Sequence, residues 1–110
     1  MRTGGSVSII AYMRRMQFIS ISRRRTEKFG DDEFAKYIDA EREQVRVLYR
    51  EGFVRAIWTR KDVAGALMLL ECDDETIAAE VVGSLPLAQR GMLEVQIVPL
   101  GPYPAFFPPK

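Results

Sequence analysis

The amino-acid sequence predicts a single α+β domain with the order strand–helix–strand–strand–helix–strand. Its 110 residues suit one domain. Four short runs are rich in apolar and β-branched residues, as strands are, and two longer stretches begin with acidic residues and carry apolar side chains at helical spacing. The chain is 47% hydrophobic and 28% charged, which is typical of a folded globular protein rather than a disordered one.

The first half of the chain predicts one strand and one helix. Residues 16–22 are apolar and β-branched and precede a basic turn, so we expect a strand there. A helix should run from about 32 to 51, because Asp31 can cap its first turn and Gly52 can take the left-handed conformation that ends a helix. The residues that recur at helical spacing along its inner stripe are Phe34, Tyr37, Ile38, Val45 and Leu48.

Two strands and a tight connection should follow this helix. Residues 53–60 predict a strand, and simple alternation along it places Arg55 and Trp58 on opposite faces. Residues 61–65 have the length and composition of a hairpin loop. The strongly apolar residues 66–72 predict a strand near the centre of the sheet.

A second helix and a last strand complete the pattern. Acidic residues at 73–75 favour a helix start, and Pro86 favours its end, because proline disfavours helix at the residue before it. The inner face of this helix should consist of Ile77, Ala78, Val81 and Leu85. Residues 92–100 predict the fourth strand.

The domain should span residues 16–100, between an N-terminal extension at 1–15 and a proline-rich C-terminal arm at 101–110. The arm should form neither helix nor central strand, and we expect it to pack on a neighbouring copy because it carries two phenylalanines. The apolar run of the extension is short and is followed by two arginines, so we do not expect a signal peptide. No apolar run approaches the ~18–20 residues that span a membrane, so we expect a soluble, cytoplasmic protein.

The predicted order is the ferredoxin-like βαββαβ arrangement, in which two helices cover one face of a four-stranded antiparallel sheet. The other face stays bare. In the first strand that face carries either Met16, Phe18 and Ser20 or Gln17, Ile19 and Ile21. Either set is too apolar to leave in water, so we expect two copies to pack sheet against sheet as a dimeric α/β barrel that encloses a cavity.

Composition excludes several classes of function. The formal net charge of +1 gives the chain no overall electrostatic attraction to nucleic acid. The chain has no histidine, which removes the commonest metal ligand and the commonest general base near neutral pH. The one cysteine, Cys72, adjoins two aspartates that disfavour its thiolate. We therefore expect no metal site, and acid–base chemistry that depends on carboxylates, tyrosine, lysine, cysteine or water.

Glu41 is the most informative candidate for such chemistry, because it falls in the middle of the apolar stripe of the first helix. A buried carboxylate costs several kcal/mol unless it is paired, hydrogen-bonded or protonated. Its pKa rises toward the range in which it can accept and return a proton. Two compatible interpretations stay open. Glu41 forms an ion pair with an arginine (Arg42, Arg46, Arg55 or Arg60), or it shuttles a proton.

Three further residues have both a structural and a functional interpretation. Tyr37, one turn before Glu41, is either a packing residue or a hydrogen-bond donor. Arg24 belongs to a basic cluster at residues 23–25, which forms either a solvated loop or a rim that binds a carboxylate. Trp58 is either a core or interface residue or the wall of a pocket for a flat cyclic ligand.

An ordered set of short motifs resembles the muconolactone isomerase family over about residues 16–105. The motifs are Arg50-Glu51-Gly52, Arg55, Ile57-Trp58, Gly65, Ser84-Leu85-Pro86-Leu87, Leu93-Glu94-Val95, Leu100 and Tyr103-Pro104. Ser84-Leu85-Pro86-Leu87, spaced before Leu93-Glu94-Val95, is the most specific of them. The chain differs from the family pattern at Ala56, where members carry histidine, and at residues 88–91, where they carry an aromatic residue. It therefore resembles a divergent member.

The resemblance implies a dimeric α/β barrel that assembles further, and a cofactor-free reaction. That reaction moves a double bond in a small unsaturated lactone by proton abstraction and return, in the degradation of aromatic compounds. Glu41 is the best match for the shuttle, with Glu43 as the neighbouring alternative. We therefore take Glu41 and Tyr37 as candidate catalytic residues, and Arg24, Arg55 and Trp58 as candidate binding residues for a small acidic organic ligand.

Two other functions stay open on the same architecture. One is a non-catalytic oligomeric module that binds a small ligand in the same cavity. The other is a cofactor-independent monooxygenase, which is suggested by analogy of fold alone.

Overall fold

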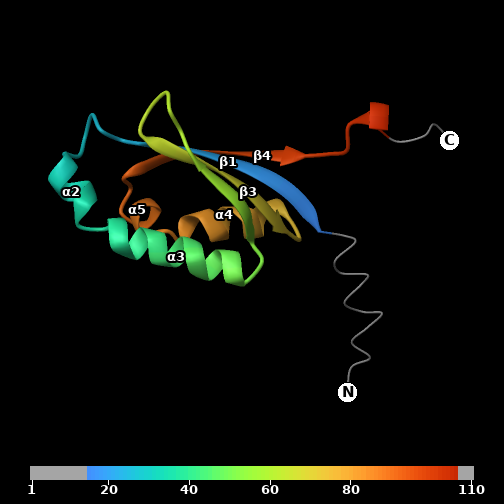
Figure 1. Ribbon diagram of the computed structural model, residues 1–110, viewed down its shortest axis with the longest axis horizontal. Coiled ribbons are helices and arrows are strands. Elements are labelled where there is room, and N and C mark those ends of the chain that lie inside the picture. Colours follow the sequence, from blue (N-terminus) through green and yellow to red (C-terminus); the bar gives the residue numbers. More distant parts are fainter. Residues whose placement is uncertain (1–14, 107–110) are drawn as a thin grey trace, which may run out of the picture.

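The computed structural model describes residues 15–106 and confirms the α+β fold (Figure 1). Its elements are β1 (Met16–Arg24), α2 (Asp31–Ala35), α3 (Ile38–Arg50), β2 (Val54–Thr59), β3 (Gly65–Cys72), α4 (Glu75–Gly83), α5 (Pro86–Gln89), β4 (Leu93–Leu100) and the 3-10 helix η1 (Pro104–Phe106). The extension expected at residues 1–15 lies outside the described residues except for its last residue, and so do residues 107–110 of the arm.

The four strands form one antiparallel sheet in the order β2-β3-β1-β4, which is the ferredoxin-like order. The strand predicted to be central, β3, lies between β2 and β1. Helices α3 and α4 lie together on one side of this sheet (Figure 1). No helix within residues 15–106 is long and apolar enough to cross a bilayer.

Burial along β1 decides which residues face the helices. Phe18, Ser20 and Ser22 are buried on the helix side, so Gln17, Ile19 and Ile21 lie on the open side. The same alternation, carried through the strand register, defines the apolar part of the open face. Its members are Ile19, Ile21, Ala56, Trp58, Leu67, Leu69, Val98 and Leu100.

The main hydrophobic core lies between the helix side of the sheet and helices α3 and α4. Its buried members are Phe18, Leu48, Val54, Met68, Leu70, Cys72, Ala78, Val81, Val82 and Leu85. Of the predicted inner residues of the second helix, Ala78 and Val81 are buried on α4 and Ile77 is partly buried, whereas Leu85 is buried beyond the end of α4, at the cap of α5. A smaller cluster of Phe34, Leu87 and Met92 packs at the end where α2 meets α5.

The single helix predicted from 32 to 51 is wrong, because the structure breaks it into α2 and α3. Tyr37, with φ −115° and ψ 0°, is the cap residue at the break. The break has a packing reason. Phe34 of α2 is buried in the smaller cluster, whereas Leu48 of α3 is buried in the main core. Two separate cores thus override a continuous helical pattern.

The caps of these helices partly follow the prediction. The cap of α2 is Gly30 and not Asp31, and the Gly30 N–H donates to Glu33 Oε1 at 2.9 Å. Gly52 has φ +89°, which confirms the left-handed end expected after α3. The acidic start of α4 is confirmed, since Asp74 accepts the N–H of Ile77 at 2.9 Å.

The prediction that Arg55 and Trp58 face opposite sides is wrong. The register between β2 and β3 shifts by one residue between Val54 and Ala56. A bulge of this kind inserts one extra residue and reverses the alternation after it. Arg55 reaches Glu71 on the open face, with 3.8 Å between Nε and Oε1, and Trp58 pairs with Leu67 of the same face.

The last third of the chain contains two short helices that were not predicted. Pro86 ends α4 as expected, but it also starts α5, because proline is favoured in the first turn of a helix. The arm was expected to contain no helix, yet Pro104–Phe106 forms the single turn η1. Residues 101–106 extend beyond β4 and away from the sheet (Figure 1), and Phe106 is 81% exposed.

Candidate functional site

A cavity of about 570 Å³ opens between α3 and the helix side of the sheet. The polar and charged residues in its lining are Ser22, Arg24, Glu41, Arg42, Arg46 and Thr59. Its apolar wall includes Val45, Ile57, Met68, Leu85, Leu87 and Leu93. The cavity thus has a largely apolar wall, together with several cations and a single carboxylate among the described lining residues.

Gly65 shapes one side of this cavity by letting two strands approach closely. A Cβ atom on Gly65 would overlap the carbonyl oxygen of Ser22 on β1. The residue after it, Ala66, donates its N–H to Ser22 Oγ at 3.3 Å. Glycine is therefore the residue type that this close approach requires, which explains its place in the hairpin motif.

Glu41 extends from α3 into the cavity and is held by the backbone of α5. Its Oε1 accepts the N–H of Leu87 at 2.9 Å. Leu87 is the second residue of α5, where N–H groups lack partners within the helix, and Pro86 before it has no N–H at all. The Ser84-Leu85-Pro86-Leu87 motif therefore presents one free backbone donor, and Glu41 accepts its hydrogen bond.

Burial raises the pKa of the Glu41 carboxyl above its ordinary value of 4.5. The Leu87 N–H and the positive charge of Arg24 both act in the opposite direction, but desolvation is the largest of the three causes. Within residues 15–106 no arginine or lysine nitrogen lies within 4.0 Å of this carboxylate. The ion pair with an arginine is thus absent there, and burial rather than a close cation determines the direction in which the pKa of this carboxyl moves.

Arg24 lies at the end of β1 and lines the same cavity. Its guanidinium carbon stands 5.4 Å from the centroid of the Phe34 ring. Among residues 15–106 no carboxylate forms an ion pair with it. An arginine with this freedom, beside an apolar wall, is suited to binding the carboxylate of a ligand.

Glu43, the alternative to Glu41, lies on the other side of α3. Its carboxylate oxygens lie 3.1 Å from Arg46 Nη1 and 3.5 Å from Arg50 Nη2. The hydrogen bond from Arg46 is the largest cause that lowers the pKa of Glu43. Glu43 is exposed and does not line the cavity, so the geometry favours Glu41 of the two.

The structure brings together two of the five predicted site residues, Glu41 and Arg24, in this cavity. Trp58, on the edge strand β2, borders the rim of the cavity, but its pairing with Leu67 places its side chain on the open face of the sheet, where it is 54% exposed. Arg55 lies on the open face beside Glu71, and Tyr37 lines a neighbouring pocket, where the Arg90 guanidinium carbon is 4.4 Å from its ring centroid. Tyr37 touches the site only through its backbone, whose carbonyl accepts the Glu41 N–H at 2.8 Å.

Sequence reasoning missed two kinds of contributor to this site. Ser22 and Thr59 line the cavity, but single hydroxyl residues on predicted strands carry no distinguishing signal. The Leu87 N–H was also missed. A proline that precedes it by one residue was the available signal, because proline at the first position of a helix leaves the following N–H groups exposed.

Residues 15–106 contain no group of three or more His, Cys, Asp or Glu side chains placed to hold a metal ion. Cys72 is buried under α4, where its Sγ donates to the Asp74 carbonyl at 3.4 Å. Burial raises the pKa of its thiol, so it lies in a setting that disfavours the nucleophilic thiolate.

Comparison with known proteins identifies the family of this fold and site. No curated protein matches the sequence. The family described as muconolactone delta-isomerase matches residues 16–105, which include all four strands and every residue named in the cavity. The chain belongs to the muconolactone delta-isomerase family.

Proposed function

We propose that this protein is a cofactor-free isomerase that moves a carbon–carbon double bond in a small unsaturated lactone bearing a carboxylate. The observation that carries the proposal is Glu41, a half-buried carboxyl of raised pKa that faces an apolar cavity beside Arg24. Membership of the muconolactone delta-isomerase family supports the same reaction class. It also supports a place for the reaction in the breakdown of aromatic compounds.

The proposed reaction needs one group that first accepts and then returns a proton. Oε1 of Glu41 is occupied by the Leu87 N–H, so Oε2 takes the proton from the carbon γ to the lactone carbonyl. The electron pair of that C–H bond spreads over the conjugated double bond and carbonyl as a dienolate. The Glu41 carboxyl then returns the proton to the α carbon. The double bond has moved by one position, and no oxidant or reductant is consumed.

Arg24 and the apolar wall have distinct parts in this scheme. Arg24 binds the carboxylate of the substrate and holds the γ carbon near Glu41. Residues such as Val45, Ile57 and Leu93 exclude water from the ring. A desolvated base is stronger than the same base in water, which suits removal of a weakly acidic proton.

The open face of the sheet supports a homodimer as part of this function. Ile19, Ile21, Leu67, Leu69 and Val98 form a contiguous apolar surface there. A face-to-face dimer would bury this surface and close the barrel. We expect a solution mass that is a multiple of the 12.5 kDa chain, and Ile21→Arg should shift it to the monomer. Val63→Arg, in the exposed hairpin, is the matched control. A monomeric wild-type protein would contradict the dimer.

Solvent deuterium exchange into a panel of unsaturated lactones tests the chemistry directly. The wild-type protein should incorporate deuterium at the γ and α carbons of its substrate and convert one isomer to the other. Glu41→Gln should still bind the lactone but should exchange and convert it about 10²–10⁴-fold more slowly than the wild type. Binding without exchange by the wild-type protein would favour the non-catalytic module, and an absence of exchange across the panel would refute the isomerase.

A further inference from the structure

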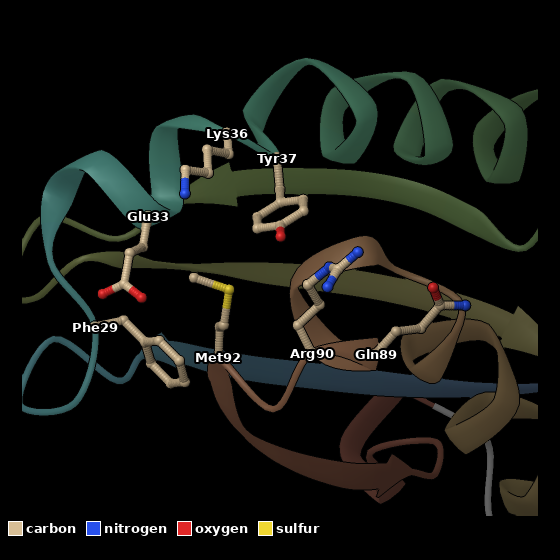
Figure 2. A pocket seen from close by; sticks show the side chains of 7 residues that line it. All are labelled: Phe29, Glu33, Lys36, Tyr37, Gln89, Arg90 and Met92. Carbon is tan, nitrogen blue, oxygen red and sulfur yellow. The ribbon is translucent and has the colours of Figure 1, made fainter.

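A second pocket, of about 470 Å³, lies where α2 and α3 meet the end of α5 (Figure 2). Tyr37 reaches into it from the α2–α3 junction and Arg90 from the opposite wall, while Lys36 lines it beside α2. Phe29 and Met92 close its floor. None of these residues lines the Glu41 cavity, so the two sites are separate.

The junction between α2 and α3 forms one wall of this pocket. Lys36 and Tyr37 are the two residues between the helices. Arg90 is anchored at the end of α5, where its N–H donates to the Pro86 carbonyl at 3.2 Å. The Arg90 guanidinium carbon lies 4.4 Å from the centroid of the Tyr37 ring, which orients the charge over the pocket.

The charge of the pocket favours an anion. Lys36 and Arg90 supply two cations against the single carboxylate of Glu33. The Glu33 carboxylate is already engaged, since its Oε1 accepts the Gly30 N–H at 2.9 Å. Within residues 15–106 neither Lys36 nor Arg90 forms an ion pair with a carboxylate. The pocket is therefore lined by two cations that have no carboxylate partner there, and both are available to the carboxylate of a ligand.

The apolar part of the pocket favours a flat ring. Met92 is a buried member of the smaller core cluster, and the half-buried Phe29 packs against that cluster. The Phe29 ring stands edge-on to the Phe34 ring, with 6.1 Å between their centroids. A rigid aromatic wall and a thioether provide good contacts for an aromatic ligand.

We propose that this pocket binds a small aromatic carboxylate, with its carboxylate between Lys36 and Arg90 and its ring against Phe29 and Met92. The proposal does not depend on the isomerase reaction, because Glu41 and Arg24 take no part in it.

Calorimetric titration with benzoate tests the site, with acetate as the ligand that lacks a ring. Benzoate should bind with millimolar affinity or better, and acetate more weakly. Arg90→Gln should weaken benzoate binding by about tenfold or more, Lys36→Gln by several-fold, and Arg90→Lys less than Arg90→Gln. The backbone amide NMR signals of Phe29, Tyr37 and Met92 should shift on titration. Both Lys36 and Arg90 are exposed, so the variants should remain folded, which circular dichroism checks.

The Arg24→Gln variant distinguishes benzoate binding in this pocket from binding in the Glu41 cavity, because Arg24 in that cavity could also bind a carboxylate. Benzoate binding that survives Arg24→Gln and falls with Arg90→Gln supports the proposal. Binding that is lost with Arg24→Gln and unchanged in both Arg90→Gln and Lys36→Gln overturns it. The proposal is also overturned if acetate binds as tightly as benzoate. It is overturned as well if no benzoate binding is detected at about 10 mM ligand.

Discussion

The two sides of α3 give the same residue type opposite chemical properties. Glu41 on the inner side accepts one backbone N–H, faces an apolar cavity, and has its pKa raised by burial. Glu43 on the outer side is 57% exposed, bonds to Arg46 and Arg50, and has its pKa lowered. Residues two positions apart on a helix are separated by about 200° around its axis. Glu41 therefore faces the protein interior, whereas Glu43 faces water.

This difference shows what makes a carboxylate useful for proton transfer. The outer glutamate has the closer cations, which stabilise its charged form and hold it deprotonated. The inner glutamate lacks an ion-pair partner within 4.0 Å among residues 15–106, so desolvation dominates its titration. A group that must both take and return a proton needs the second environment.

The largest expected effect is on turnover after removal of the inner carboxylate. Glu41→Gln should lower kcat for lactone isomerisation by about 10²–10⁴-fold, because the amide keeps an acceptor for the Leu87 N–H but cannot carry the proton. Glu43→Gln is the matched control and should leave kcat within about twofold of the wild type. Equal losses in the two variants would remove the distinction between the two sides of α3.

The next effect concerns the cation that faces the inner carboxylate. Arg24→Gln should lower kcat/KM by about 10–100-fold, mainly through a higher KM, because a hydrogen bond between charged groups contributes about 1.5–3 kcal/mol. Arg50→Gln removes a cation from the outer side, where it pairs with Glu43, and should change kcat/KM little. Steady-state kinetics that show equal KM values for the two variants would argue against Arg24 as the carboxylate-binding residue.

The pH dependence of the reaction should report the raised pKa of Glu41. Because the charged carboxylate is the base, kcat/KM should fall as pH decreases through an apparent pKa above the ordinary value of 4.5. The profile of Glu43→Gln should coincide with that of the wild type, since Glu43 lies outside the cavity. An apparent pKa at or below 4.5 would mean that burial does not control the catalytic base.

The smallest expected effect is on stability, and its sign differs between the two glutamates. The folded state binds the Glu41 proton more tightly than the unfolded chain does. As pH rises from 4.5 toward the raised folded pKa of Glu41, the contribution of this residue therefore lowers the free energy of unfolding of the protein. Glu43 has a lowered folded pKa, so its stabilisation is present above 4.5 and is lost as pH falls through that lowered pKa.

Urea unfolding at several pH values measures both signs. Relative to the wild type, Glu41→Gln should gain stability from acid to neutral pH, whereas Glu43→Gln should lose a small amount over the same range. Because Glu43 is exposed, its difference should shrink further in high salt. A gain by both variants would show that α3 does not separate two environments.

Much of the fold follows from local patterns. The strand order, the central position of β3, the left-handed Gly52 and the Asp74 cap all agree with predictions from spacing and residue type. The errors have non-local causes. The break at Tyr37 arises because Phe34 and Leu48 belong to separate cores, and the bulge before Ala56 follows from pairing with β3. Both errors therefore depend on contacts between residues that are distant in the sequence.

The candidate site divides in the same way. Glu41 was found because a carboxylate on an apolar stripe breaks a helical pattern, which is a local signal. Arg55 and Tyr37 were expected beside it, yet one faces the open side of the sheet and the other a separate pocket. Their directions depend on a one-residue register shift and on a helix break. Hydrophobic periodicity does not encode either event.

The sequence by itself determined the order of elements, the inner stripe of α3 and the position of Glu41 on it, because these depend on the periodicities of helix and strand. The tertiary structure alone decided that the Leu87 N–H, and not an arginine, holds the Glu41 carboxylate. That contact joins residues 46 positions apart. Which groups meet over such a separation depends on how whole elements pack, and local residue preferences contain little information about it.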